Sequence, residues 1–146
     1  MVSSPAPLDS GGREKMRIAL LAVAGIALAG FLIVAVVMPQ LAATEARDAA
    51  QALIAGAEQA KQQVDAAAAK SGKLDGAGAG VKVAARTDPK HGEMKWVVSD
   101  NGAIRGWNEQ NALEITMTPI LQGGKTGWNC RGYPVSAMPP SCGGRS

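Results

Sequence analysis

The sequence predicts an α+β fold in which a long N-terminal helix packs on a four-stranded antiparallel sheet. Three features carry this prediction: an uncharged apolar run over residues 18–38, an alanine-rich helical pattern over residues 40–70, and four short strand-like runs after residue 93. Helices come first in the chain and strands follow, an order that favours α+β architecture. The alanine-rich helix is the only element available to cover the apolar face of the sheet.

Residues 18–38 are long and apolar enough to cross a membrane. They contain no charged side chain, and at about 1.5 Å per residue they span about 30 Å as a helix, the thickness of a bilayer core. Arg13, Lys15 and Arg17 sit just before the run, against Glu14 alone in residues 10–17. By the positive-inside rule, residues 1–17 form a short cytoplasmic tail, disordered over residues 1–12, and residues 39–146 form an extracytoplasmic domain.

Two other interpretations of this run stay open. It resembles the apolar part of a cleaved secretory signal, with Leu41-Ala42-Ala43 as the exit, although it exceeds the usual length of such a part. It also fits a buried helix of a soluble core. Both the anchor and the signal place the residues from 40 onward outside the cytoplasm.

Pro39 interrupts the helical pattern directly after the apolar run. Its missing N–H and its ring predict a kink at this point, with the helix resuming from Gln40 to Lys70. Ser71-Gly72 then ends the helix. The expected buried face is thin and consists mostly of methyl groups; its members are Leu41, Ala49, Ala52, Leu53, Ala60, Val64 and Ala67. The alternative is a solvated stalk that packs on nothing.

Two of the four strand-like runs lie within residues 94–107 and flank Asn101-Gly102. This dipeptide predicts a hairpin with a type I′ turn, in which both central residues have φ > 0. Residues 81–92 are expected to be a connecting loop, with an edge strand at 81–85 as an option.

The other two strand-like runs come later in the chain. Residues 113–119 alternate apolar and polar side chains, as a strand with one buried face does. Pro119 predicts that this strand ends there or lies at an edge. Residues 126–130 follow the Gly123-Gly124 turn and supply the fourth strand.

Composition limits the classes of function. After Pro39 the chain has 12 basic and 10 acidic residues, a balance that does not favour nucleic-acid binding. Cys130 and Cys142 form an isolated pair, which in an exported domain predicts a disulfide worth about 3 kcal/mol. His91 is the sole histidine, so we expect no metal site and no cofactor.

These features, taken in order, resemble the type IV pilins of bacteria. The likeness covers about residues 22–142. The residues that carry it are Pro39, Ala46-Arg47, Ala60-Lys61 and Val64, and then Leu113–Pro119, Gly124, Trp128-Asn129-Cys130 and Pro139-Pro140-Ser141-Cys142. The resemblance implies a pilin-like fold with final strands and a disulfide-bounded loop.

The chain departs from that family at the membrane edge. Pilin precursors carry a leader ending in glycine and then a Phe-Thr-Leu-Ile-Glu-like run, and the glutamate helps to register subunits. Here Arg17 stands in place of the glycine, Ile18–Ala22 replaces the run, and residues 18–38 hold no acidic side chain. This departure predicts a divergent or minor subunit, or an unprocessed anchored relative, and leaves N-terminal methylation open.

The function expected from the resemblance is that of a membrane-anchored, non-enzymatic structural or adhesion component of a type IV pilus system. Its expected location is the bacterial inner membrane, with the C-terminal domain in the periplasm, or the pilus. Its expected partners are the membrane, other pilin subunits or assembly proteins, and surfaces or cells. We expect no catalytic residues, because the chain has one histidine, no clustered carboxylates and no serine in a strained glycine-rich elbow. Glu109 and Glu114 could lie near each other, but such carboxylates are usually just solvated.

The alternative function is an anchored periplasmic binding module, for example for DNA during uptake. Aromatic side chains would stack on bases and basic side chains would meet phosphates. The aromatic candidates are Trp96, Trp107, Trp128 and Tyr133, and the basic candidates are Lys82, Arg86, Lys90, Lys95, Arg105, Lys125 and Arg131. Tryptophans in short strands usually belong to a core, so we do not expect nucleic acid as a partner.

Overall fold

The computed structural model describes residues 10–145, and the chain divides into two compact units between Leu41 and Ala42. The first nine residues of the expected cytoplasmic tail lie outside the described residues. Residues 10–12, expected to be disordered, instead belong to the first helix. No proline separates them from the apolar run, so the helix that starts in the run extends back into the tail.

The first unit is helical throughout its described residues. Helix α1 (Ser10–Leu32) leads into a π-helical turn, Ile33–Val37, and then into α2 (Met38–Gly56). The Met38 N–H bonds to the Ile33 carbonyl, five residues back. Pro39 has no N–H for the carbonyl four residues before it, and its ring would clash there, so the wider turn accommodates the proline. The helix resumes after Pro39, as expected; the kink stays a prediction.

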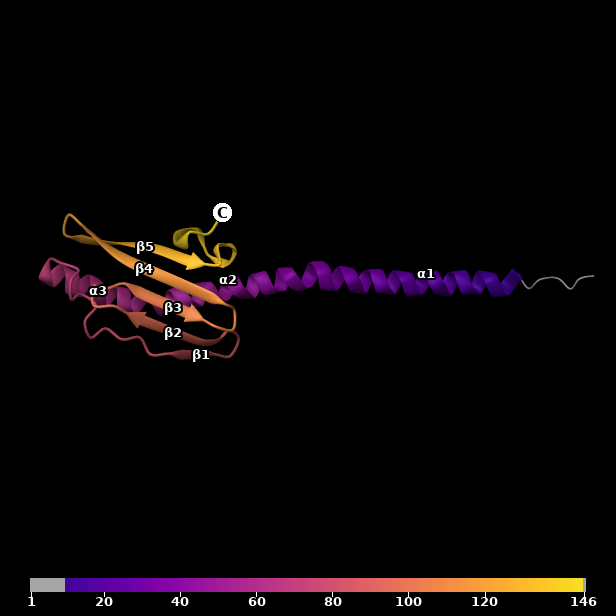
Figure 1. Cartoon of the computed structure of the whole chain (residues 1–146), viewed down its shortest axis with the longest axis horizontal. Coiled ribbons are helices and arrows are strands. Elements are labelled where there is room, and N and C mark those ends of the chain that lie inside the picture. The colour runs from indigo at the N-terminus through magenta and orange to yellow at the C-terminus, as the bar shows by residue number, and fades with distance from the viewer. Residues whose placement is uncertain (1–9, 146) are drawn as a thin grey trace, which may run out of the picture. The chain divides into compact units, whose positions relative to one another are not determined.

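The second unit contains one antiparallel sheet of five strands in the order β1-β2-β3-β4-β5 (Figure 1). Its strands are β1 (Arg86–Asp88), β2 (Gly92–Val98), β3 (Ile104–Asn108), β4 (Leu113–Gln122) and β5 (Lys125–Tyr133). The α+β prediction is therefore confirmed, with one strand more than the four expected. The missed strand, β1, falls inside the segment expected to be a loop.

Strand β1 escaped prediction because it is short and its pattern is weak. It has three residues, none of them buried, and it ends where Pro89 begins a turn. It pairs with β2 from Asp88↔Gly92 to Arg86↔Met94. The pairing depends on the neighbouring strand and not on an alternation in its own sequence. The optional edge strand at 81–85 does not form.

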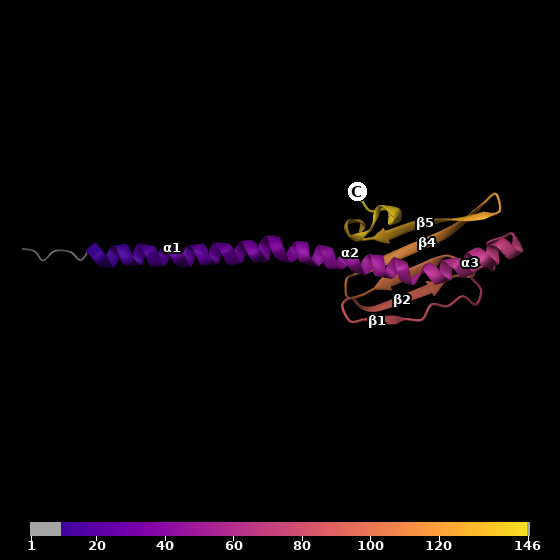
Figure 2. The same cartoon turned by 180° about the vertical axis from the view of Figure 1, so that it is seen from behind.

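Within the second unit, α2 and α3 (Glu58–Ser71) cover one face of the sheet (Figure 2). The residues fully buried there include Leu53 and Val64 from the helices, with Met94, Ile104 and Ile115 from the strands. Of the face expected from the sequence, Ala49, Leu53, Ala60 and Val64 are buried, Ala52 and Ala67 are half-buried, and Leu41 is exposed. Small helix side chains let the backbone approach the sheet closely, which excludes the stalk interpretation.

The helix is interrupted at Ala57, directly above Trp96. The Ala57 N–H bonds to the Ile54 carbonyl, three residues back, and so leaves the Leu53 carbonyl without its helical partner. The Trp96 indole N–H donates to that Leu53 carbonyl at 2.9 Å. Gly56 makes room for the ring, since a Cβ there would lie 2.2 Å from a ring carbon of Trp96. The break therefore ties the helices to the middle of β2.

The hairpin between β2 and β3 forms at Asn101-Gly102, but the expected type I′ turn is wrong. Gly102 has φ +87°, whereas Asn101 is not among the described residues with positive φ. The Gly102 N–H bonds to the Ser99 carbonyl, and the Ser99 N–H to the Ala103 carbonyl. The loop is thus longer than two residues, and the Asn101 side chain accepts the Ala103 N–H instead of adopting the left-handed conformation.

Strand β4 continues through Pro119 to Gln122, beyond the end expected from the sequence. Pairing with β3 stops at Ile104↔Met117, so Pro119 pairs with Trp128 of β5 alone. The residue therefore lies at a local edge, where its missing N–H breaks no ladder bond.

We predict that Gly56→Ala destabilises the second unit by about 1–3 kcal/mol, because the added methyl group forces the Trp96 ring to move. An ordinary Gly→Ala change in a helix would instead stabilise it by about 0.5–1 kcal/mol. Thermal unfolding followed by near-ultraviolet circular dichroism measures the difference.

Gly127→Ala is the matched control, because the nearest atom to its added Cβ is 3.8 Å away. Equal stability of the Gly56→Ala variant and the parent chain would show that the close contact with Trp96 does not affect the free energy of unfolding.

Candidate functional site

The first candidate site is the apolar surface of the N-terminal helix. Among the described residues, one helix is long and apolar enough to cross a membrane, and its most apolar stretch is entirely exposed. Ile18 is 63% exposed and Phe31 is 67% exposed. A helix that is apolar on every side has no favourable environment in water. The interpretation as a buried core helix is therefore wrong, and the surface is suited to lipid or to other helices.

The second candidate site is the loop closed by the disulfide, which is confirmed. Cys130 of β5 is joined to Cys142 of the 3₁₀ turn Pro140–Cys142, across a separation of 12 residues. The loop is packed and not loose, since Ala137 and Met138 are buried against the main core. Gly132 allows this approach, because a Cβ there would lie 2.1 Å from the Met138 sulfur. The bridge thus fixes a small folded surface at the end of β5.

The aromatic candidates for base stacking do not form one surface. Trp96 is buried, and Trp128 is half-buried, with its indole N–H bonded to Asp65 of α3 at 2.8 Å. Trp107 and Tyr133 lie on the opposite face of the sheet, by the alternation of the strands. Two of the four aromatic residues therefore serve the core, as the sequence suggested.

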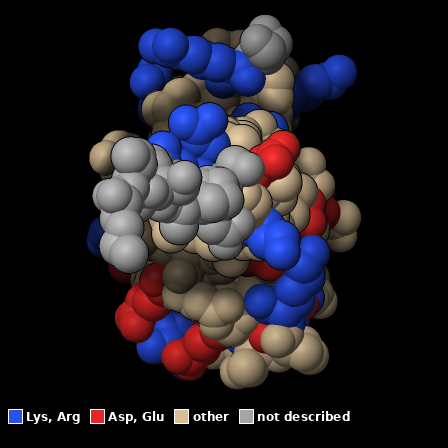
Figure 3. All heavy atoms as spheres, turned by 90° about the vertical axis from the view of Figure 1, so that its right-hand side faces the viewer, with Lys and Arg blue, Asp and Glu red and all other residues tan. Residues whose placement is uncertain are grey.

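The basic candidates are divided between the two faces of the sheet, and Lys95, Arg105 and Arg131 share the face of Trp107. Arg86 lies 5.7 Å from the centre of the Trp96 ring, and Lys90 and Lys95 pair with Asp48 and Glu93. Arg105 pairs with Glu114 at 2.7 Å, and this hydrogen bond and charge raise the pKa of Arg105. Basic and acidic side chains appear together on the face drawn in Figure 3. Three of the seven basic candidates, Lys90, Lys95 and Arg105, are thus paired with acidic side chains.

The described residues contain no group of His, Cys, Asp and Glu that could hold a metal ion. His91 is buried, and its carbonyl accepts the Asn108 side-chain amide at 2.8 Å. Glu114 is engaged with Arg105, and Glu109 lies in the loop after β3. No nucleophile–base pair is present among these side chains, which are the ones singled out from the sequence.

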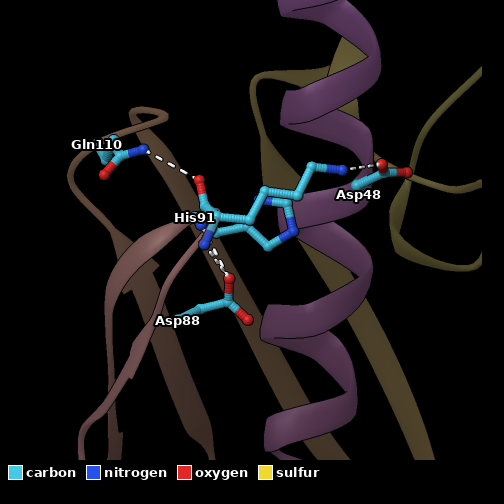
Figure 4. A network of polar contacts seen from close by, with 5 residues as sticks. Asp48, Asp88, His91 and Gln110 are labelled. Carbon is cyan, nitrogen blue, oxygen red and sulfur yellow. Dashed lines mark hydrogen bonds and ion pairs between the residues drawn. The ribbon is translucent and has the colours of Figure 1, made fainter.

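Sequence reasoning missed a polar network that joins α2 to the turns at one end of the strands (Figure 4). The Lys90 ammonium lies 3.0 Å from the Asp48 carboxylate of α2, and the Lys90 carbonyl accepts the Gln110 amide at 3.3 Å. The Asp88 carboxylate accepts the backbone N–H groups of His91 at 2.9 Å and Lys90 at 2.7 Å. In the sequence, only the Asp88-Pro89 turn signal pointed to this polar network.

The side chain of Asn108 forms hydrogen bonds with residues of the same two turns. It is fully buried, and its amide donates to the carbonyls of His91 and Glu93 at 2.8 and 2.9 Å. Its oxygen accepts the backbone N–H and the side-chain amide of Asn111. A buried amide with all these partners fixes the relative positions of the β1–β2 and β3–β4 turns.

Comparisons with protein-family models, with curated proteins and with solved structures found no match to this chain. The long N-terminal helix on an antiparallel sheet, with a disulfide near the C-terminus, is compatible with a pilin-like fold.

We predict that the double variant Cys130→Ser/Cys142→Ser loses about 3 kcal/mol of unfolding free energy, because the bridge restricts a short loop of the unfolded chain. Urea unfolding of the parent and the variant measures this loss. Reduction of the parent chain should give the same loss, and an unchanged urea midpoint in both cases would contradict the prediction.

We also predict a pH dependence that arises from Asp88. The hydrogen bonds from His91 and then Lys90 lower the pKa of Asp88 in the folded state. A lowered folded pKa contributes stability that is present above the unfolded carboxyl pKa, about 3.9, and is lost as pH falls through the folded pKa.

The difference in urea midpoint between the parent and Asp88→Asn should therefore shrink from about pH 7 to about pH 2.5. Asn is a suitable replacement because its side-chain oxygen can still accept the two N–H groups, but carries no charge. The same difference at both pH values would contradict this role for Asp88.

Proposed function

We propose that this chain is a membrane-anchored, non-enzymatic pilin-like protein of a bacterial type IV pilus system. The observation that carries the proposal is the exposed apolar helix, followed along the chain by a small α+β unit closed by a disulfide. The helix supplies an anchoring or bundle-packing surface. The sheet and the Cys130–Cys142 loop supply surface for contacts with other subunits, assembly proteins, cells or solid supports.

The proposed location is the inner membrane, with residues 39–146 in the periplasm, and the pilus where the chain polymerises. The basic residues before the apolar run support this orientation. The disulfide supports it independently, because such bonds persist in oxidising compartments such as the periplasm.

The lack of an acidic side chain within residues 18–38 favours a divergent or minor subunit, or an unprocessed anchored relative. In the pilin family the glutamate at the membrane edge registers each subunit against its neighbour. An unpaired carboxylate in lipid is costly and needs a partner charge. A chain without this group is able to anchor in the bilayer, but it has no such means of setting its position in a filament.

The absence of catalysis is part of the proposal. Holding and contacting other molecules requires exposed surface and a rigid support, and the buried Asn108 amide and the disulfide provide rigidity. The carboxylates considered for acid–base chemistry are Glu109 and Glu114, and Glu114 is engaged in an ion pair.

Mass spectrometry of the protein purified from membranes tests the proposal. We expect an oxidised disulfide and an N-terminus at Met1 or Met16, which indicates an unprocessed anchor. An N-terminus within residues 11–18, carrying a methyl group, also supports the proposal and indicates a filament subunit. Recovery from the cytosol with both thiols free, or a mature chain that begins near Ala43, would overturn it.

A matched pair of variants tests the anchor itself. Arginine in mid-membrane costs about 2.5–3.5 kcal/mol per residue on an insertion scale, so Leu28→Arg with Phe31→Arg should release the protein from the membrane fraction. Leu41→Arg, beyond residues 18–38, should leave it there. Equal recovery of both variants in the membrane fraction would contradict the proposed span.

A further inference from the structure

Among the described residues of the second unit, no helix lies over the face of the sheet that is turned to the viewer in Figure 1. Along each strand, the side chains that alternate with the core residues point to this face. The strand register places Lys95, Trp107, Glu114 and Tyr133 in one row across β2, β3, β4 and β5. Tyr133 is 72% exposed, so large aromatic surface lies outside the core here.

Within this row, Trp107 is the residue that lines a surface hollow on each of its two sides. One hollow, of about 360 Å³, is lined mainly by apolar groups and includes Val97, Arg105 and Thr116 beside Trp107. A second hollow, of about 200 Å³, is lined by Trp107 with Glu93, Lys95, Glu109 and Gln110. Trp96 and Trp128 pack against the helices, whereas Trp107, which is half-buried, lies between two surface hollows that are open to solvent.

The charges around Trp107 are balanced. Lys95 lies 3.3 Å from Glu93, and the Arg105 guanidinium lies 2.7 Å from Glu114. The rim therefore offers cationic donors and anionic acceptors next to one another, with little net charge. This pattern complements neutral groups that both donate and accept hydrogen bonds, which is the property of a hydroxyl.

We propose that Trp107 is the centre of a binding site for a neutral oligosaccharide. The C–H groups on the face of a pyranose ring carry partial positive charge and are attracted to the negative face of the indole. The sugar hydroxyls donate to the carboxylates of Glu93 and Glu109 and accept from Lys95. The three carboxylates here are matched by three cations, Lys95, Arg105 and Arg131, so the face has no excess positive charge to attract a polyanion such as nucleic acid.

Tyr133 extends the site to a second sugar. Strands β3 and β5 are separated by β4 alone, so Trp107 and Tyr133 lie about 10 Å apart across the sheet, at about 4.8 Å per strand. Two aromatic side chains at this spacing contact two rings of one extended chain and leave a ring between them over Glu114. The site requires only that this face be accessible, so it is independent of whether a pilus forms.

The test uses the full chain in lipid nanodiscs, because detergents with sugar headgroups would compete for the site. Cellotetraose and chitotetraose are the probes, and isothermal titration calorimetry measures their affinity. We expect at least one of them to bind with a dissociation constant in the range of about 1 mM or tighter. Trp107→Ala should weaken that binding about tenfold or more, and Trp107→Phe should weaken it less, because the phenyl ring still stacks.

Two further variants sharpen the comparison. Tyr133→Ala should weaken the binding of the tetrasaccharide and leave the binding of the matching disaccharide unchanged, because a disaccharide on Trp107 does not reach Tyr133. Ile120→Ala is the matched control, since Ile120 is exposed and lies six residues along β4 from Glu114 of the row. Its affinity for both sugars should equal that of the parent chain.

A spectroscopic measurement on the parent chain keeps the test independent of the stability of the variants. Sugar should shift the indole N–H resonance of Trp107. The resonance of Trp96, whose indole N–H is hydrogen-bonded to the Leu53 carbonyl, should stay unchanged. The inference is overturned if neither sugar binds saturably, or if the Trp107 resonance does not move. It is also overturned if Trp107→Ala retains full affinity while folded.

Two other occupants of the face would give different results. Binding of single-stranded DNA that weakens with salt, without sugar binding, would assign the face to nucleic acid and overturn the inference. Self-association that is abolished by Trp107→Ala, again without sugar binding, would assign it to a second copy of this chain.

Discussion

The close approach of an alanine-rich helix pair to the sheet is the constraint on which the second unit depends. Ala49, Ala50, Ala57, Ala60 and Ala68 are all buried, and their small side chains bring the backbone to the strands. With few large apolar residues, the core has to gain its stability from close packing and not from volume. The hydrogen bond from the Trp96 indole to the Leu53 carbonyl shows how near the layers lie.

The same constraint explains where the polar groups go. The helix break at Ala57 frees a carbonyl, and the indole of Trp96 satisfies it. At the β1 edge of the sheet, the Asp48–Lys90 pair links the β1–β2 turn to α2, and the buried Asn108 amide ties that turn to the β3–β4 turn. At the other edge the disulfide fixes the loop after β5. Polar contacts at one edge of the sheet and a covalent bond at the other thus supplement the packing of a thin core.

One face of the sheet is committed to this packing, and the other is left for contacts outside the chain. The register puts the core residues on one side of β2, β3 and β4 and the mixed charged and aromatic side chains on the other. Because the covering helices and the bridge hold the strands rigidly, the outer side chains keep their spacing. This property suits the contact role that we propose for the chain.

Periodicity and composition determined the apolar run, the helix after Pro39, two strands within residues 94–107, the strands near residues 113–119 and 126–130, and the pairing of the two cysteines. These features are local, or follow from there being only two thiols. The tertiary structure decided the rest: the fifth strand, the loop at Asn101-Gly102, the break under Trp96 and the separation of Trp107 from the other tryptophans. These depend on contacts between residues far apart in the chain, and no local pattern records which partner a backbone group or a ring will meet.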